Sequence, residues 1–190
     1  MLQKKIKEIT IIGPGLIGAS IGLALKKKKI SSKIVGIDNS KSNLIDAQKV
    51  KAIDEKRHKI DDRISKSQII FICTPVSKID SLVAEILPFI TNKETIITDV
   101  GSVKKCFSKK TINLAKEKCN LIPGHPIAGT EYSGAKNSKV NLFEKKWCIL
   151  TPIQKQKKSL SILAKIWKEI GMKVSIMSMD EHDKIMSITS

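Results

Sequence analysis

The stretch Gly13-Pro14-Gly15-Leu16-Ile17-Gly18 decides the fold. It follows the apolar run Glu8-Ile9-Thr10-Ile11-Ile12 and opens a helix-like segment that extends to Leu25. In a strand, turn and helix of this kind, the first glycine allows the tight turn and the second lets the backbone approach a pyrophosphate. The third lets the helix pack closely on the strand. Because N–H groups and the dipole at a helix start attract phosphates, we predict a dinucleotide site formed by Gly13, Gly15, Leu16, Ile17 and Gly18.

A second apolar run, Ile34-Val35-Gly36-Ile37, ends at Asp38. At this point of such a fold, a carboxylate accepts hydrogen bonds from the adenosine ribose hydroxyls. It also repels a 2′-phosphate, so Asp38 favours NAD over NADP as the cofactor. Lys41, three positions later, could help hold a 2′-phosphate and keeps NADP as an alternative.

The same residues allow two other interpretations. A glycine-rich turn can be only a turn, but the strand before it, the helix after it and Asp38 favour the dinucleotide. Ile9 to Leu25 are also 17 residues without a charge between lysine-rich flanks, as in a signal peptide or short membrane anchor. The run is at the short limit for crossing roughly 30 Å of hydrocarbon, contains Pro14 and lacks a small-x-small cleavage site. We therefore predict no membrane partner.

Composition narrows the class of protein. The chain has 190 residues and is 41% hydrophobic, enough for one substantial domain or for one domain and the beginning of another. The net charge is +17, with 33 lysines among 35 basic residues spread along the whole chain, and only 4% of the residues are aromatic. Nucleic-acid binders more often concentrate basic residues on one element and add arginine or stacking groups. We predict no nucleic-acid partner, although the charge favours anionic ligands.

The four cysteines, Cys73, Cys106, Cys119 and Cys148, form no CxxC pair and have no histidine at metal spacing. We therefore predict no metal site. Cys73 and Cys148 lie in apolar runs, where a thiol behaves as a small hydrophobe. Without a credible secretion signal, the predicted location is the reducing cytoplasm.

Short apolar runs alternate with amphipathic segments, which predicts an α/β fold: a doubly wound, mostly parallel sheet with helices on both faces, the Rossmann-type NAD-binding domain. The predicted strands are 7–13, 33–38, 68–73, 95–100, 120–123, 146–151 and 172–177. The predicted helices are 15–28, 40–50 with Ser40 as N-cap, 77–88 ending near Pro88, 102–118 and 156–170. Residues 130–145 are predicted to be a long loop.

The domain is expected to cover residues 1–177. Residues 178–190 contain a helix start with acidic residues in its first turn, and the chain stops at Ser190. We expect them to be the start of a truncated helical domain.

Ligands of a doubly wound sheet lie beyond the carboxyl ends of the strands. Three stretches follow predicted strands there: Thr74-Pro75, Asp99 to Lys104, and Gly124 to Glu131. We expect all three to converge near the nicotinamide end of the dinucleotide, with Thr74 and Pro75 contacting the cofactor.

His125 is the best catalytic candidate, because an imidazole can accept a substrate hydroxyl proton near neutral pH while hydride leaves for the cofactor. It could also be a turn histidine that satisfies backbone groups. Ser102 could donate a hydrogen bond to His125 or to the substrate, and could also cap the following helix. Lys104 could meet a substrate carboxylate or be a solvated lysine.

The two other histidines are weaker candidates. His58 lies among charged residues and is expected to be solvated. His182, near Asp180 and Asp183, could orient the next domain or lie at the surface.

Three motifs resemble the prephenate/arogenate dehydrogenase family of tyrosine biosynthesis. They are Gly13-Pro14-Gly15-Leu16-Ile17-Gly18 with Ser20, Thr98-Asp99-Val100-Gly101-Ser102-Val103-Lys104, and Gly124-His125-Pro126-Ile127-Ala128-Gly129-Thr130-Glu131 with Ser133-Gly134. The first is generic to dinucleotide folds, the second is shared with a few relatives, and the third is quite specific. Their order and spacing cover nearly all of the chain, including Glu181-His182-Asp183.

The resemblance implies oxidative decarboxylation of prephenate to 4-hydroxyphenylpyruvate, or of arogenate to tyrosine. Hydride would pass from the ring C4 to NAD while His125 takes or polarises the C4 hydroxyl proton. By the same resemblance, Ser102 would orient His125 and the substrate, and Thr130 and Glu131 would line the substrate pocket.

Members of that family carry a second, all-helical domain that forms a homodimer and supplies further substrate-binding groups, and it is not present after Ser190. We therefore expect this chain to bind cofactor but to turn over substrate poorly alone, because positioning contributes several kcal/mol to catalysis. Two alternatives stay open: another NAD-dependent hydroxy-acid dehydrogenase, and a non-catalytic NAD-binding regulatory domain.

Overall fold

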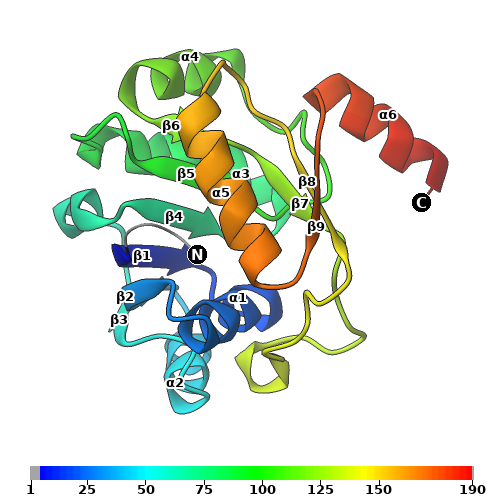
Figure 1. Ribbon diagram of the computed structural model, residues 1–190. Coiled ribbons are helices and arrows are strands. Elements are labelled where there is room, and N and C mark those ends of the chain that lie inside the picture. Colours follow the sequence, from blue (N-terminus) through cyan, green and yellow to red (C-terminus); the bar gives the residue numbers. More distant parts are fainter. Residues whose placement is uncertain (1–4, 190) are drawn as a thin grey trace.

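The computed structural model describes residues 5–189, and its main feature is a six-stranded parallel sheet (Figure 1). The strand order is β3-β2-β1-β4-β5-β6. The strands are β1 (Ile6–Ile12), β2 (Ser31–Ile37), β3 (Glu55–Arg57), β4 (Ile69–Ile72), β5 (Ile96–Asp99) and β6 (Asn120–Leu121). Strands are added on one side of β1 first and on the other side afterwards, so the switch point lies between β1 and β4. The predicted fold class is confirmed.

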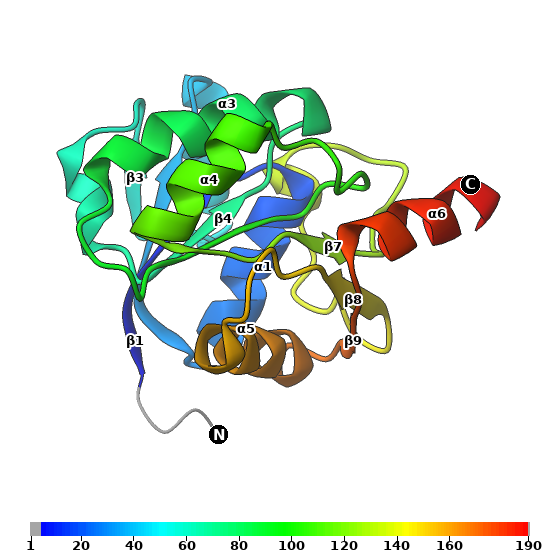
Figure 2. The ribbon, with the colours of Figure 1, turned by 90° about the horizontal axis from the view of Figure 1, so that it is seen from above.

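Helices cover both faces of this sheet (Figure 2). α1 (Leu16–Lys27) and α5 (Lys157–Glu169) pack on one face, and α3 (Val76–Ile86) and α4 (Lys109–Lys118) pack on the other. α2 (Lys41–Lys49) packs beside β2 and β3. Three short 3₁₀ helices are η1 (Asp62–Lys66), η2 (Leu87–Phe89) and η3 (Ala135–Asn137).

The apolar runs of the strands reflect burial on both faces. In β4, Ile69 and Phe71 join the core under α1 and α5, whereas Ile70 and Ile72 join the core under α3 and α4. Side chains alternate along a strand, so a strand covered on both sides carries apolar residues toward both faces. Trp167 of α5 meets Phe71 edge to face, with ring centroids 5.8 Å apart, and fixes that helix on the sheet.

A second sheet of three strands follows β6. It has the order β7-β8-β9, with β7 (Gly124–Pro126) antiparallel to β8 (Trp147–Leu150), and β8 parallel to β9 (Lys173–Ile176). The two last predicted strands therefore exist, but they pair with each other and with β7 rather than with β6. α6 (Met179–Thr189) follows β9 and projects from the body of the molecule (Figure 1).

Several predicted boundaries were wrong. The helix predicted at 102–118 begins only at Lys109, where the Oγ of Ser108 accepts a hydrogen bond from the N–H of Thr111 at 3.1 Å. Ser102 is therefore not the N-cap of that helix. Ser40 is the N-cap of α2 as predicted, with its Oγ 3.3 Å from the N–H of Asn43. β3 was not predicted, because Glu55-Lys56-Arg57 is a charged run without an apolar pattern.

The assignment of 178–190 to a second domain stays a prediction. Its last residue and residues 1–4 of the first predicted domain lie outside the part that the structure describes. The uncharged run from Ile9 to Leu25 is divided between β1, the glycine turn and α1. Within residues 5–189, no helix combines the length and apolar character needed to cross a membrane.

Candidate functional site

The glycine turn between β1 and α1 is shaped by close approach of its neighbours. Gly13 has φ +77°, and a Cβ there would lie 2.9 Å from the carbonyl oxygen of Cys73. A Cβ at Gly18 would lie 2.6 Å from the carbonyl oxygen of Gly13, so only glycine lets α1 pack this closely. At both positions the surrounding backbone leaves no room for a side chain, as expected for a glycine in the tight turn and a glycine where the helix packs on the strand.

Gly15 differs from these two glycines. A Cβ added there would meet no protein atom within 4 Å, so backbone is accessible at this point of the turn. No side chain caps the start of α1 at Gly15, and the first N–H groups of a helix have no partner inside the helix. The buried Oγ1 of Thr74, beside Gly13, also has no hydrogen-bond partner within the described residues. Uncapped N–H groups and an open backbone approach fit the pyrophosphate of a dinucleotide.

A pocket of about 380 Å³ adjoins this turn, within the range of small-molecule sites. It brings together Gly13, Asp38, Thr74 and Pro75 from three separate points of the sequence. The Asp38 carboxylate accepts hydrogen bonds from the N–H of Ser40 at 2.8 Å and from Nδ2 of Asn43 at 3.1 Å. These two contacts hold the carboxylate at the end of β2, where a ribose hydroxyl would meet it.

The basic groups of this pocket were not predicted from the sequence. Lys59 and Lys78 line it together with Glu85, whereas Lys41 does not. Their signal was hidden because lysines occur throughout the chain. The two ammonium groups can pair with phosphate groups, while the carboxylates of Asp38 and Glu85 balance their charge within the pocket.

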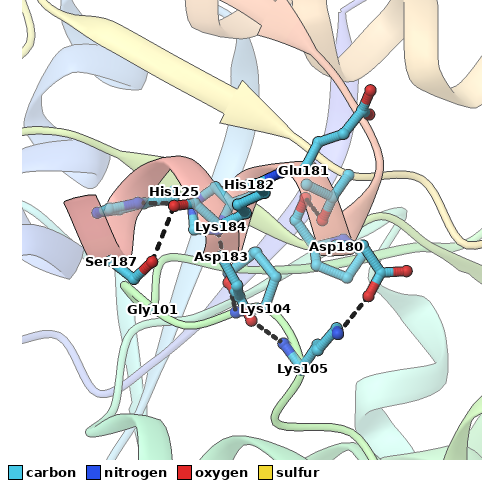
Figure 3. Close-up of polar contacts among 12 residues, drawn as sticks. Gly101, Lys104, Lys105, His125, Asp180, Glu181, His182, Asp183, Lys184 and Ser187 are labelled. Atoms are coloured by element: carbon cyan, nitrogen blue, oxygen red, sulfur yellow. Dashed lines mark hydrogen bonds and ion pairs between the residues drawn. The ribbon is translucent and has the colours of Figure 1, made fainter. Parts of the chain in front are cut away.

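The second part of the site is His125, in the middle of β7 and paired with Ile149 of β8. Its Nδ1 lies 2.9 Å from Nε2 of His182, a partner that was not predicted from the sequence. Nδ1 of His182 lies 2.7 Å from Oδ1 of Asp183. Figure 3 shows the first turn of α6, which carries His182 and Asp183, lying against the loop of Lys104 and Lys105. His182 is fully buried, so the predictions of a surface role were wrong.

The charge state of His125 suits a proton acceptor. Burial is the largest cause that lowers the pKa of His125 to about 4; the charge of Lys104 acts in the same direction, and Asp183 opposes them. The ring is therefore neutral at pH 7. A neutral imidazole has one ring nitrogen with a free lone pair.

Lys104 is not placed to meet a substrate. Its side chain is fully buried, and its Nζ donates to Oδ2 of Asp99 at 2.5 Å and to the carbonyl oxygen of Gly124 at 2.5 Å. Burial raises the pKa of Asp99, and the Lys104 ammonium and the N–H groups of Gly101 and Gly124 oppose this. Both predictions for Lys104, substrate contact and solvation, were wrong. The ion pair instead ties the end of β5 to β7 beside His125.

Three predicted site residues are not joined to His125 by hydrogen bonds within residues 5–189. Ser102 is exposed, and the hydrogen-bond partner of the His125 ring is His182 instead. Thr130 uses its Oγ1 on the backbone of Tyr132, and Glu131 is exposed. Their roles toward a substrate stay predictions. His58 is exposed, as expected.

Comparison with known proteins gives a consistent result. Residues 21–176 match the family model described as prephenate dehydrogenase, nucleotide-binding domain. A prephenate dehydrogenase of Bacillus subtilis is 33% identical over 183 residues, 96% of this chain and 49% of that protein. The chain spans about half the length of the curated relatives that it matches.

Solved structures give the same result. The crystal structure of prephenate dehydrogenase from Aquifex aeolicus, in complex with hydroxyphenyl propionate and NAD+, has a TM-score of 0.86 and 30% identity. The match covers 96% of this chain and 64% of that one. The Synechocystis arogenate dehydrogenase has a TM-score of 0.87 and 28% identity, over 96% of this chain and 64% of that one.

Proposed function

This chain belongs to the prephenate dehydrogenase family, and from that premise we propose that it serves NAD-dependent oxidative decarboxylation of prephenate or arogenate in tyrosine biosynthesis. The observation that carries the proposal is a neutral His125 on β7, next to Gly124, whose N–H contacts Asp99 at the carboxyl end of β5. The glycine turn and Asp38 follow β1 and β2, so they lie at the carboxyl ends of strands in the same parallel sheet as β5. When bound, NAD would supply the hydride acceptor. The residues of this chain would bind it and handle the substrate proton.

Each group has a definite task in this proposal. The turn from Gly13 to Gly18 would hold the pyrophosphate on the start of α1, and Asp38 would accept the ribose hydroxyls. His125 would accept the proton of the C4 hydroxyl as hydride leaves C4. The substrate ring would then lose its carboxyl group as carbon dioxide and become aromatic, which makes the reaction effectively irreversible.

The choice of NAD over NADP rests on Asp38, whose carboxylate would repel a 2′-phosphate. Lys59 and Lys78 in the same pocket would attract it, so the two effects oppose each other. The effect of Asp38 is expected to dominate, because hydrogen bonds from Ser40 and Asn43 hold its carboxylate in position. A homodimer, the absence of a nucleic-acid partner and a cytoplasmic location stay predictions from the sequence.

Calorimetric titration of the chain with NAD and with NADP tests this proposal. We expect NAD to bind more tightly, and we expect Asp38→Ala to weaken or reverse that preference. Binding of neither cofactor, or a preference that Asp38→Ala leaves unchanged, would contradict the cofactor site. NADH formation from prephenate and from arogenate then tests the substrates, and hydride transfer retained in His125→Asn would favour another hydroxy-acid dehydrogenase.

A further inference from the structure

A continuous hydrogen-bonded series runs from Asp183 through His182 to His125. We propose that His182 and Asp183 are positioning residues that hold the His125 ring in a single tautomer. In this tautomer the proton is on Nδ1, and Nε2 keeps its lone pair for the substrate hydroxyl. The inference rests on the proposed function, because it gives the Nε2 lone pair a substrate to act on.

The series begins at Asp183, whose carboxylate is held by three donors. Its Oδ1 accepts from the N–H of Lys104 at 2.9 Å and lies 2.7 Å from Nδ1 of His182, and its Oδ2 accepts from the N–H of Lys105 at 2.9 Å. Burial pushes the pKa of Asp183 upward, but these hydrogen bonds outweigh it and the pKa lies below its usual value. An ionised carboxylate only accepts hydrogen bonds, so the proton between the two groups belongs to Nδ1 of His182.

That proton fixes the other end of His182. With its proton on Nδ1, a neutral His182 has a lone pair on Nε2 and can only accept there. The facing Nδ1 of His125 must then be the donor across the 2.9 Å contact. The opposite arrangement requires an imidazolium at a position without exposure to water, which costs free energy.

Nε2 of His125 is the nitrogen that remains. It has no hydrogen-bond partner within residues 5–189, and the His125 side chain is partly exposed. The series thus uses the inner nitrogen of the ring and leaves the other one as a proton acceptor.

The start of α6 is fixed by contacts of its own (Figure 3). Ser178 and Glu181 form a capping box, in which Glu181 accepts from the N–H of Ser178 at 2.8 Å and Ser178 accepts from the N–H of Glu181 at 3.2 Å. Lys105 also forms an ion pair with Asp180.

Lys104 connects the two ends of the series. Its N–H donates to Asp183, and its buried Nζ donates to the carbonyl oxygen of Gly124, next to His125 in the chain. The two histidines are therefore held by one closed set of hydrogen bonds. Such support is what keeps a reactive group within the narrow geometry that catalysis needs.

Long-range ¹H–¹⁵N correlation spectra of the ¹⁵N-labelled chain at pH 7 distinguish the ring tautomers directly. The chain has only three histidines, and the exposed His58 is an internal reference. Because a series of hydrogen bonds that ends at a charged carboxylate favours one tautomer, we expect an excess of about tenfold or more of the Nδ1–H form of His125. A dominant Nε2–H form in the unmodified chain would overturn the proposal.

Asp183→Asn tests the origin of that preference. An amide cannot accept from all three donors, so the tenfold excess should fall or reverse, as happens when an orienting aspartate beside a histidine is replaced. Asp180→Asn is the matched control, since it removes the same charge from the same helical turn at a side chain that is 77% exposed. An excess that Asp183→Asn leaves unchanged, or that Asp180→Asn reduces equally, would also overturn the proposal.

The spectrum needs neither cofactor nor substrate. Failure of the chain to bind NAD would overturn the proposed function and leave the tautomer result standing. Conversely, NAD binding with His125 in the Nε2–H form would retain the cofactor site and remove the positioning role of His182 and Asp183.

Discussion

Nδ1 of His125 lies 2.9 Å from Nε2 of His182, although 57 residues separate them in the chain. The rings meet edge to face, with centroids 5.1 Å apart and an interplanar angle of 66°. The contact joins the strand β7 to the helix α6, and β8, α5 and β9 lie between them in the chain. The candidate proton acceptor therefore depends on a helix at the far end of the chain.

The free energy of unfolding should decrease as the pH is lowered, because of His125. Its pKa of about 4 in the fold is below the usual 6.5, so the unfolded chain binds more protons between these values. The stabilisation is present above about pH 6.5 and is lost as pH falls toward 4. With about 1.4 kcal/mol per pKa unit and an allowance for partial exposure, the loss is on the order of 2 kcal/mol.

Urea unfolding of the unmodified chain and of His125→Gln at pH 7 and at pH 4.5 measures this effect. The free energy of unfolding should depend less on pH in His125→Gln, while His58→Gln, at an exposed position, should behave as the unmodified chain. Equal pH dependence in all three proteins would contradict the lowered pKa.

Lys104→Met should destabilise the fold strongly. It leaves the Asp99 carboxylate buried without its cation, and breaking a buried pair by removing one partner costs about 3 to 5 kcal/mol. Lys105→Met is the matched control at the next position, because its ion pair with Asp180 is exposed and contributes little. Denaturant unfolding at pH 7 compares them, and similar stabilities for the two variants would rule out a structural role for the Lys104 pair.

Two glycine substitutions should separate stability from cofactor binding. In Gly18→Ala the added Cβ meets Gly13 and Ile11 at less than 3 Å, so we expect a loss of about 1 to 3 kcal/mol from overpacking. In Gly15→Ala it meets no protein atom, φ is −75°, and the fold should keep its stability.

Thermal unfolding and calorimetry distinguish the two effects. Gly15→Ala should weaken NAD binding at unchanged stability, because the methyl group occupies the approach of the pyrophosphate. NAD binding by Gly15→Ala as tight as in the unmodified chain would show that the cofactor does not approach this point of the turn.

His125→Asn should lower the rate of hydride transfer by about 10² to 10⁴, the usual contribution of general acid–base catalysis. The dissociation constant of NAD should stay nearly unchanged, since the cofactor groups lie at the turn and at Asp38. NADH formation from prephenate or arogenate measures the rate, and calorimetry measures the binding. A parallel loss of both would instead indicate that the variant disturbs the fold.

Much of the fold could be predicted because burial on both faces leaves a plain signal. The short apolar runs at Ile9 to Ile12 and Ile69 to Ile72 indicated strands covered by helices. The spacing of the glycines from Gly13 to Gly18 indicated the turn between a strand and a helix. β3 gave no such signal, since its charged residues lie at the edge of the sheet. The helix expected from 102 begins at Lys109 because the preceding segment carries Lys104 into the core.

The sequence by itself determined the class of fold, the dinucleotide turn with Asp38, and His125 as the candidate proton acceptor, because these depend on local spacing and on residue type. Tertiary structure alone decided the partners of His125 and the role of Lys104. A lysine and a histidine carry no local sign of burial: each becomes internal only where the fold turns a carboxylate, Asp99 or Asp183, toward it in place of the water that it loses.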